Sequence, residues 1–91
     1  MFVVLFSSRF RRSLRKLPSH IQRDFDKRFD VFKKYPFNPT LRTHNLHGSL
    51  EMYYAFYLRD GYRVLFEFVD EYTILLINIG SHGDYAHWEK M

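Results

Sequence analysis

The sequence predicts one α+β domain in which a hairpin of two helices covers one face of an antiparallel sheet. An apolar run opens the chain, two helical patterns follow it, and three strand-like segments make up the second half. The expected elements are residues 2–6, 8–17, 19–35, 51–58, 62–69 and 73–80. A chain of 91 residues can build one core and not two, so residues 1–91 are expected to form a single domain.

The first strand and helix are predicted from an apolar run and a serine pair. Residues 2–6 are all apolar, which favours a strand buried on both faces. Ser7 or Ser8 can cap the helix that follows. Its inner stripe has i, i+4, i+7 spacing and consists of Phe10, Leu14 and Leu17. Its outer face is basic and consists of Arg11, Arg12, Arg15 and Lys16.

The second helix is bounded by two prolines. Pro18 ends the first helix, and the segment Ser19 to Gln22 matches a capping box. The apolar stripe consists of Ile21, Phe25, Phe29, Phe32 and Tyr35. Pro36 disfavours a helical conformation in the residue before it, so the helix is expected to end at Tyr35. Residues 36–48 are predicted to be a loop because they are rich in Pro, Asn and Gly.

Short gaps at residues 59–61 and 70–71 predict that the three later strands form an antiparallel meander. The expected register pairs Leu58 with Tyr62, Phe56 with Val64, Tyr54 with Phe66, Tyr62 with Ile79, Val64 with Ile77, and Phe66 with Leu75. The core face then contains Met52, Tyr54, Phe56, Tyr62, Val64, Phe66, Phe68, Leu75, Ile77 and Ile79. The opposite face presents Tyr53, Ala55, Tyr57, Arg63, Leu65, Glu67, Ile74, Leu76 and Asn78.

Charge is distributed unevenly along the chain. Residues 1–44 carry 11 basic and three acidic side chains, whereas residues 45–91 carry three basic and seven acidic ones. A basic half is typical of a protein that approaches nucleic acid or an acidic partner, although solvated helix faces explain it equally well. The opening apolar run is too short for a signal peptide or a membrane span, so we expect a soluble cytoplasmic protein.

The chain contains no cysteine, so the chemistry available to it comes from histidine, arginine, tyrosine, lysine and carboxylate side chains. Tyr57, Arg63 and Asn78 are predicted to lie side by side on the sheet face opposite the core. His82 has the same parity as Asn78 and joins them if the segment from Gly80 to Gly83 turns back. Arginine binds phosphate oxygens and histidine transfers protons near neutral pH, so this face suits RNA cleavage by the 2′-hydroxyl.

The order of these motifs resembles the RelE/ParE toxin superfamily, particularly its RelE and YafQ-like mRNA interferases. The resemblance covers nearly the whole chain and includes Leu46-His47-Gly48, Tyr62-Arg63-Val64 and the segment from Gly80 to Tyr85. It implies a RelE-like microbial ribonuclease fold and the toxin of a type II toxin-antitoxin pair. Such a toxin cleaves mRNA on the ribosome without a metal or other cofactor, and an antitoxin protein neutralises it.

The resemblance also assigns roles to individual residues. Arg63 matches the arginine that stabilises the phosphate, His82 matches the general acid, and His44 matches a loop histidine. The general base is left open between Glu67, Tyr57 and His44. Substrate contacts are expected from Tyr85, Asn78 and Arg59.

Two departures from the YafQ-like pattern leave other functions open. Tyr57 stands where those enzymes have a strand histidine, and Gly61 stands where they have an aspartate. A ParE-like inhibitor of DNA gyrase is therefore one alternative, and an inactive protein that binds an antitoxin or RNA is another. His44 and His47 lie close together in sequence, but no further ligand cluster accompanies them, so no metal site is predicted.

Overall fold

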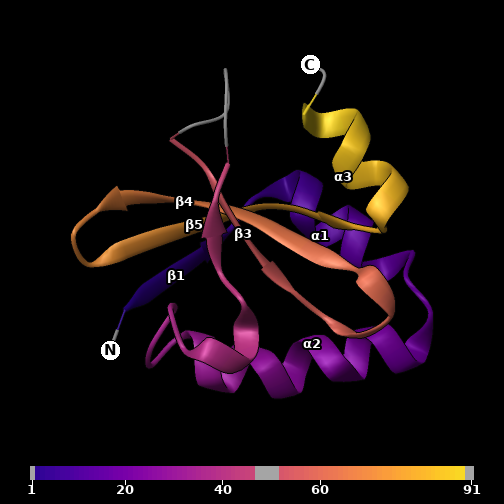
Figure 1. Ribbon diagram of the computed structural model, residues 1–91, viewed down its shortest axis with the longest axis horizontal. Helices are drawn as coiled ribbons and strands as arrows, with labels where there is room; N and C mark the ends of the chain where they lie inside the picture. Colours follow the sequence, from indigo (N-terminus) through magenta and orange to yellow (C-terminus); the bar gives the residue numbers. More distant parts are fainter. Residues whose placement is uncertain (1, 47–51, 90–91) are drawn as a thin grey trace.

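The computed structural model describes residues 2–46 and 52–89 (Figure 1). In chain order, its elements are β1 (Val3–Phe6), α1 (Ser8–Arg15), α2 (Ser19–Phe32), the 3₁₀ turn η1 (Pro39–Leu41), β2 (His44–Asn45), β3 (Tyr54–Tyr57), the 3₁₀ turn η3 (Arg59–Gly61), β4 (Arg63–Asp70), β5 (Thr73–Gly80) and α3 (His82–Glu89). The predicted strand start at Glu51 and the motif residues His47 and Gly48 lie outside the described residues.

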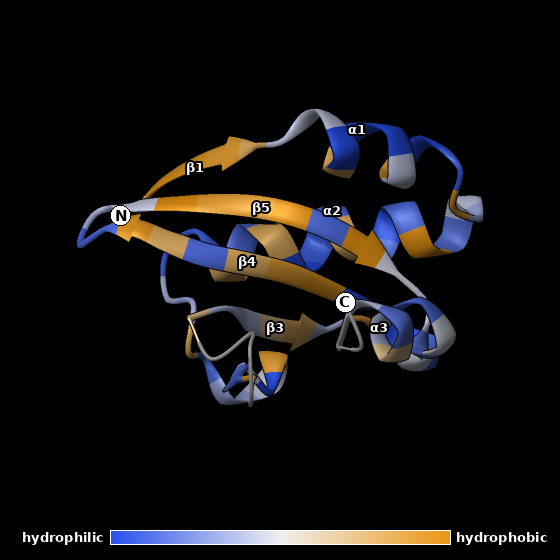
Figure 2. Ribbon diagram, turned by 90° about the horizontal axis from the view of Figure 1, so that it is seen from above, coloured by the Kyte–Doolittle hydropathy of each residue, from blue (hydrophilic) through white to orange (hydrophobic). Residues whose placement is uncertain are grey.

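The strands form one mixed sheet in the order β1-β5-β4-β3-β2. Strand β1 runs parallel to β5, and the other neighbouring pairs are antiparallel. Figure 2 shows β1, β5, β4 and β3 side by side in this order. The predicted α+β class and the antiparallel meander of β3, β4 and β5 are confirmed. No helix in the described ranges is long and apolar enough to cross a membrane.

The two sheet faces are covered by different helices. Helices α1 and α2 bury the larger core against one face, and α3 packs a smaller core on the other (Figure 1). Phe32 of α2 is fully buried and stacks on Phe56 of β3 with a centroid distance of 4.5 Å. Phe66 of β4 meets Phe32 edge-on at 4.9 Å. Aromatic side chains therefore join the helical hairpin to the middle of the sheet.

Strand β1 lies at the edge of the sheet, so the prediction that it is buried on both faces is wrong. Val3 and Leu5 are 57% and 48% exposed because only β5 pairs with this strand. The predicted start of the following helix is confirmed, but α1 ends at Arg15, before the predicted stripe residue Leu17. The Ser7 hydroxyl accepts a hydrogen bond from the Phe10 N–H at 3.0 Å, and Phe10 is buried. The basic residues predicted to face water are exposed: Arg11, Arg12, Arg15 and Lys16.

Helix α2 differs from the prediction at both ends. Pro18 is its N-cap, and the Gln22 side chain donates to the Leu17 carbonyl at 2.9 Å, so the predicted capping box does not form. The helix ends at Phe32, and Tyr35 is 56% exposed in the turn that follows. The predicted loop at residues 36–48 contains η1 and β2 within its described part.

A bulge in β5 changes the predicted faces. The β3–β4 register is confirmed, but the predicted β4–β5 register is wrong: Ile79 pairs with Val64 and not with Tyr62, and Phe66 pairs with Leu76 and not with Leu75. Leu65 pairs with Asn78 while Phe66 pairs with Leu76, which leaves Ile77 as an extra residue. Ile74 and Leu76 consequently lie in the larger core, and Ile77 packs against the smaller one, the reverse of the prediction. Met52, also predicted to lie in the core, is 67% exposed.

Helix α3 was not predicted. Its first turn is held by reciprocal hydrogen bonds between Ser81 and Asp84. The Ser81 N–H donates to the Asp84 carboxylate at 2.9 Å, and the Asp84 N–H donates to the Ser81 hydroxyl at 3.3 Å. This is a capping box, and the spacing from Ser81 to Asp84 was its signal in the sequence.

Candidate active site

Arg63 lies at the start of β4, directly opposite Tyr57 of β3. Its guanidinium carbon is 4.7 Å from the centroid of the Tyr57 ring and 4.4 Å from that of Tyr85 in α3. Its Nε is buried and has no hydrogen-bond partner within the described residues. The two rings therefore hold the guanidinium in place while one of its donors stays unused.

The capping box of α3 brings His82 next to Arg63. Arg63 Nη2 and His82 Nδ1 are 2.8 Å apart, and the imidazole is exposed. Arginine carries only donors, so Nδ1 must accept this hydrogen bond. The ring proton is then on Nε2, and His82 is a hydrogen-bond donor at that atom.

His44 of β2 lies on the other side of the same tyrosines. Its ring stacks on Tyr57 at a centroid distance of 5.4 Å. Its Nδ1 is 3.2 Å from the backbone carbonyl of Arg42, which can only accept, so Nδ1 carries the proton. Its Nε2 is 3.1 Å from the Tyr85 hydroxyl and is the accepting nitrogen of the neutral ring. His44 and His82 are thus held as opposite tautomers.

We call Arg63, His82, His44, Tyr57 and Tyr85 the Arg63 cluster. Its members come from β2, β3, β4 and α3, and all five were predicted as site residues. Tyr85 is only 6% exposed and belongs to the smaller core, so α3 packs on the sheet through a residue of the cluster.

Arg42 is a neighbour of the cluster that sequence reasoning missed. Its guanidinium carbon lies 4.2 Å from the centroid of the Tyr57 ring. The residue has a positive φ of 52° at the end of η1. This left-handed conformation turns the chain into β2 and is uncommon for a residue other than glycine. The sequence therefore did not predict that Arg42 would lie beside Tyr57. Together, Arg42 and Arg63 give the cluster two cations.

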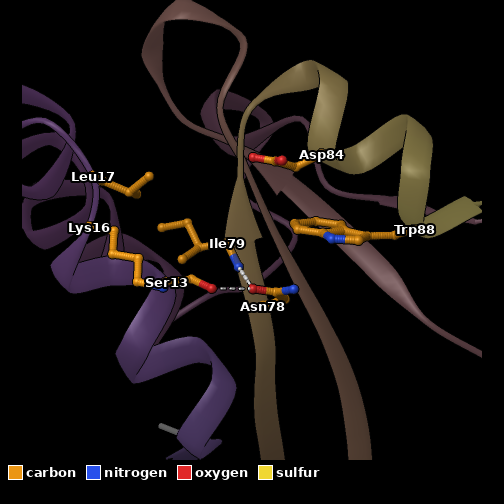
Figure 3. Close-up of a pocket in the computed structure, with 7 residues that line it drawn as sticks. All are labelled: Ser13, Lys16, Leu17, Asn78, Ile79, Asp84 and Trp88. Atoms are coloured by element: carbon orange, nitrogen blue, oxygen red, sulfur yellow. Dashed lines mark hydrogen bonds between the residues drawn. The ribbon is translucent and has the colours of Figure 1, made fainter.

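Asn78 does not lie beside Arg63 as predicted. Its Oδ1 accepts hydrogen bonds from the Ser13 hydroxyl of α1 at 2.8 Å and from the Ile79 N–H at 2.9 Å (Figure 3). Beyond the end of β1, α1 lies next to β5 and takes the Asn78 side chain as a partner. Asn78 therefore joins a different pocket.

Two further predicted residues are separate from the cluster. Glu67 is four residues along β4 from Arg63, a distance of about 13 Å in an extended strand. Arg59 belongs to the η3 turn, where its backbone N–H donates to Asp24 of α2 at 2.9 Å and its side chain lies 3.9 Å from Asp60. The hairpin loop thus directs Arg59 toward the helices and away from Arg63.

Within residues 2–46 and 52–89, no three His, Cys, Asp or Glu side chains gather closely enough to form a metal site. The Arg63 cluster and the neighbouring Arg42 offer two cations, two imidazoles and two phenols, which are groups that bind anions and move protons.

Comparison with known proteins identifies the fold. No protein-family model and no curated protein sequence matches the chain. Among solved structures, the isolated RelE toxin of Escherichia coli matches with a TM-score of 0.71 and 23% identity, over 99% of this chain and 97% of that one. YafQ of E. coli matches with a TM-score of 0.73 and 11% identity, over 93% and 98% of the two chains.

A third match comes from an archaeal complex. A chain of the RelB-RelE antitoxin-toxin complex of Methanococcus jannaschii has a TM-score of 0.74 and 20% identity, over 92% of this chain and 96% of that one. These likenesses extend over nearly the full length of each protein, although few residues are identical. The chain has the fold of the RelE/ParE toxin superfamily.

Proposed function

We propose that this protein is the toxin of a type II toxin-antitoxin pair and that it cleaves mRNA on the ribosome. The similar structures named above include a RelE toxin and an antitoxin-toxin complex, which supports a toxin with a protein antitoxin as its partner. The Arg63 cluster supports the nuclease activity because it combines a cation for the phosphate with two histidines for proton transfer.

The observation that carries this proposal is the opposite hydrogen bonding of the two histidines: Nδ1 of His82 faces the donor Arg63, whereas Nδ1 of His44 faces the carbonyl of Arg42. His44 Nε2 is unprotonated and acts as the general base that removes the proton of the RNA 2′-hydroxyl. The 2′-oxygen then attacks the neighbouring phosphorus, and the bond to the 5′-oxygen breaks. His82 donates its Nε2 proton to that leaving oxygen. The products are a 2′,3′-cyclic phosphate and a free 5′-hydroxyl.

Arg63 has two tasks in this scheme. Its guanidinium neutralises charge that develops on the non-bridging phosphate oxygens, and its hydrogen bond to Nδ1 keeps His82 in the donating tautomer. The aromatic rings of Tyr57 and Tyr85 orient the guanidinium. His44 exchanges the Tyr85 hydroxyl for the substrate hydroxyl when RNA binds.

The geometry also favours His44 over the other two candidate bases. Glu67 lies too far along β4 to reach a phosphate held at Arg63. The Tyr57 ring is covered by two guanidinium groups and an imidazole, an environment that suits a supporting platform. Proton transfer by a positioned group contributes about 10²- to 10⁴-fold to rate, so losing either histidine should reduce cleavage by a similar factor.

The experiment is primer extension on ribosome-bound mRNA after induction of the protein. We expect cleavage sites with the wild type and their loss with His82→Ala and His44→Ala. The matched control is His87→Ala, because His87 is an exposed histidine of the same helix outside the cluster. Wild-type cleavage by both cluster variants would disprove the assignment. Inhibition of supercoiling without RNA cleavage would instead identify a gyrase inhibitor.

A further inference from the structure

A second pocket lies on the side of α3 that faces α1. It has a volume of about 330 Å³ and opens between α1, β5 and α3 (Figure 3). Its polar lining comes from Ser13, Lys16, Asn78 and Asp84, and the indole of Trp88 projects from α3 toward β5. This volume is within the range of sites that bind small molecules, about 300–1,000 Å³.

The amide of Asn78 has a fixed orientation in this pocket. The Ile79 N–H can only donate, so the atom it contacts must be the Asn78 oxygen. The Ser13 hydroxyl donates to the same oxygen. Both anchoring bonds therefore use Oδ1, and the Nδ2 group with its two N–H donors points to the Trp88 side (Figure 3). Asn78 is 9% exposed and lines the pocket, and neither anchoring bond uses the two donors of Nδ2, so a ligand that enters the pocket can accept from them.

The other walls separate a ring-binding end from a cationic end. Trp88 packs against Tyr85 at a centroid distance of 6.2 Å, which holds the indole in position. Asp84 lies on the α3 side and repels a phosphate, whereas Lys16 lies across the pocket, at the C-cap of α1, and attracts one. A ligand with a flat ring, hydrogen-bond acceptors on its edge and a phosphate at the Lys16 end would match Trp88, Asn78 and Lys16 and keep its charge away from Asp84.

We propose that this pocket binds a nucleotide of the RNA strand next to the scissile bond. The base packs against Trp88 with an acceptor edge at Asn78 Nδ2, and its phosphate lies near Lys16. This inference rests on the proposed nuclease function. His82 and Asp84 are two residues apart in α3, about 3 Å along the helix axis, so a strand crossing the start of α3 reaches both sites.

Trp88 is the only tryptophan of the chain, so its fluorescence reports directly on the pocket. We would titrate the four nucleoside 5′-monophosphates and inorganic phosphate into the His82→Ala variant, which keeps every residue of the pocket. Saturable quenching by at least one nucleotide and none by inorganic phosphate is expected. Absence of nucleotide quenching at millimolar concentrations would overturn the inference, and so would equal binding of phosphate alone.

The decisive variant is Asn78→Asp. One carboxylate oxygen can still accept from Ser13 and Ile79, while the other presents an acceptor where the wild type presents donors. Mispairing one polar contact costs about 1–3 kcal/mol, so nucleotide affinity should fall by about 5- to 150-fold. Lys16→Gln should weaken nucleotide binding, whereas Lys34→Gln, which changes an exposed lysine outside the pocket, should not.

Cleavage kinetics separate this inference from the nuclease proposal. In an active background, Asn78→Asp should raise KM for RNA and leave kcat within about threefold of wild type, because it touches no reacting group. Unchanged affinity and KM, with a thermal unfolding midpoint equal to that of wild type, would overturn the pocket and leave the nuclease intact. Nucleotide binding without any RNA cleavage by the wild type would overturn the nuclease and leave the pocket.

Discussion

Replacing Arg63 by methionine should abolish cleavage at almost no cost in stability. The buried Nε without an acceptor costs about 1–3 kcal/mol in the wild type. The contacts of the Arg63 guanidinium with the Tyr57 and Tyr85 rings, at 4.7 and 4.4 Å, stabilise the wild type by about 0.5–1 kcal/mol each. Methionine retains an unbranched side chain between the rings and needs no hydrogen bond. The free energy of unfolding should therefore stay within about 1 kcal/mol of wild type.

Activity should respond very differently. Arg63 is the group that touches the phosphate in the proposed reaction, and removing one such electrostatic contact lowers the rate by about 10²- to 10³-fold. The assay combines thermal unfolding with cleavage of a defined RNA. A change of 1 kcal/mol in the free energy of unfolding moves the unfolding midpoint of a domain of this size by about 4–8 °C, so Arg63→Met should shift the midpoint by no more than this.

Phe56→Ala provides the comparison for stability because Phe56 is fully buried in the larger core. Truncating such a ring costs about 3–5 kcal/mol. If Arg63→Met lowered stability as much as Phe56→Ala, Arg63 would be a structural residue and the argument from its unused donor would be wrong. If Arg63→Met retained wild-type cleavage, Arg63 would have no part in the chemistry.

Three further substitutions test other parts of the structure. Gly80→Ala would place a Cβ 2.6 Å from Asp84 Oδ2, so α3 must shift. We expect a clear loss of RNA cleavage and only a small decrease in the thermal unfolding midpoint. Ser7→Ala should cost about 1–2 kcal/mol in chemical denaturation, because the hydroxyl caps α1 and donates to the Ile77 carbonyl at 2.8 Å. Burial raises the pKa of Asp24, but hydrogen bonds from the Arg59 backbone and Arg28 outweigh it, so the pKa lies below its ordinary 3.8. The stabilisation from ionised Asp24 is present above the pKa of the unfolded state and is lost as the pH falls through the pKa of the folded state. Asp24→Asn should therefore have a lower free energy of unfolding than wild type at neutral pH, and this difference should shrink below about pH 4.

The fold could be predicted because local patterns and tertiary contacts agree in most of the chain. The short loop at residues 59–61 and the alignment of the apolar sides of β3 and β4 set their register, since a slip by one residue would have exchanged the faces. Strand β5 lacked such a constraint. Its residues from Ile74 to Ile77 are all apolar, so either face of this segment can be buried. The sequence pattern therefore does not indicate the bulge at Ile77.

The site could be predicted only in part because it combines near and distant segments. Tyr57 and Arg63 follow from the register, and His82 required a turn that two glycines made plausible. The tautomer of His82 depends on Arg63 of β4, which no local pattern reveals, and that of His44 depends on the carbonyl of Arg42, whose left-handed turn the sequence does not indicate. Asn78 shares the parity of the active-site face, but α1 lies closer and takes its side chain.

Helix α3 contributes to the smaller core, the Arg63 cluster and the second pocket. It carries His82 to Arg63 at its first residue, places Tyr85 in the smaller core and holds Trp88 at the pocket. One docking event therefore assembles the acid, one ring beside the guanidinium and the proposed nucleotide site together. The larger core lies on the opposite face of the sheet and does not depend on this helix. A change that loosens α3 should thus reduce cleavage and Trp88-reported nucleotide binding in parallel, while most of the folding stability remains.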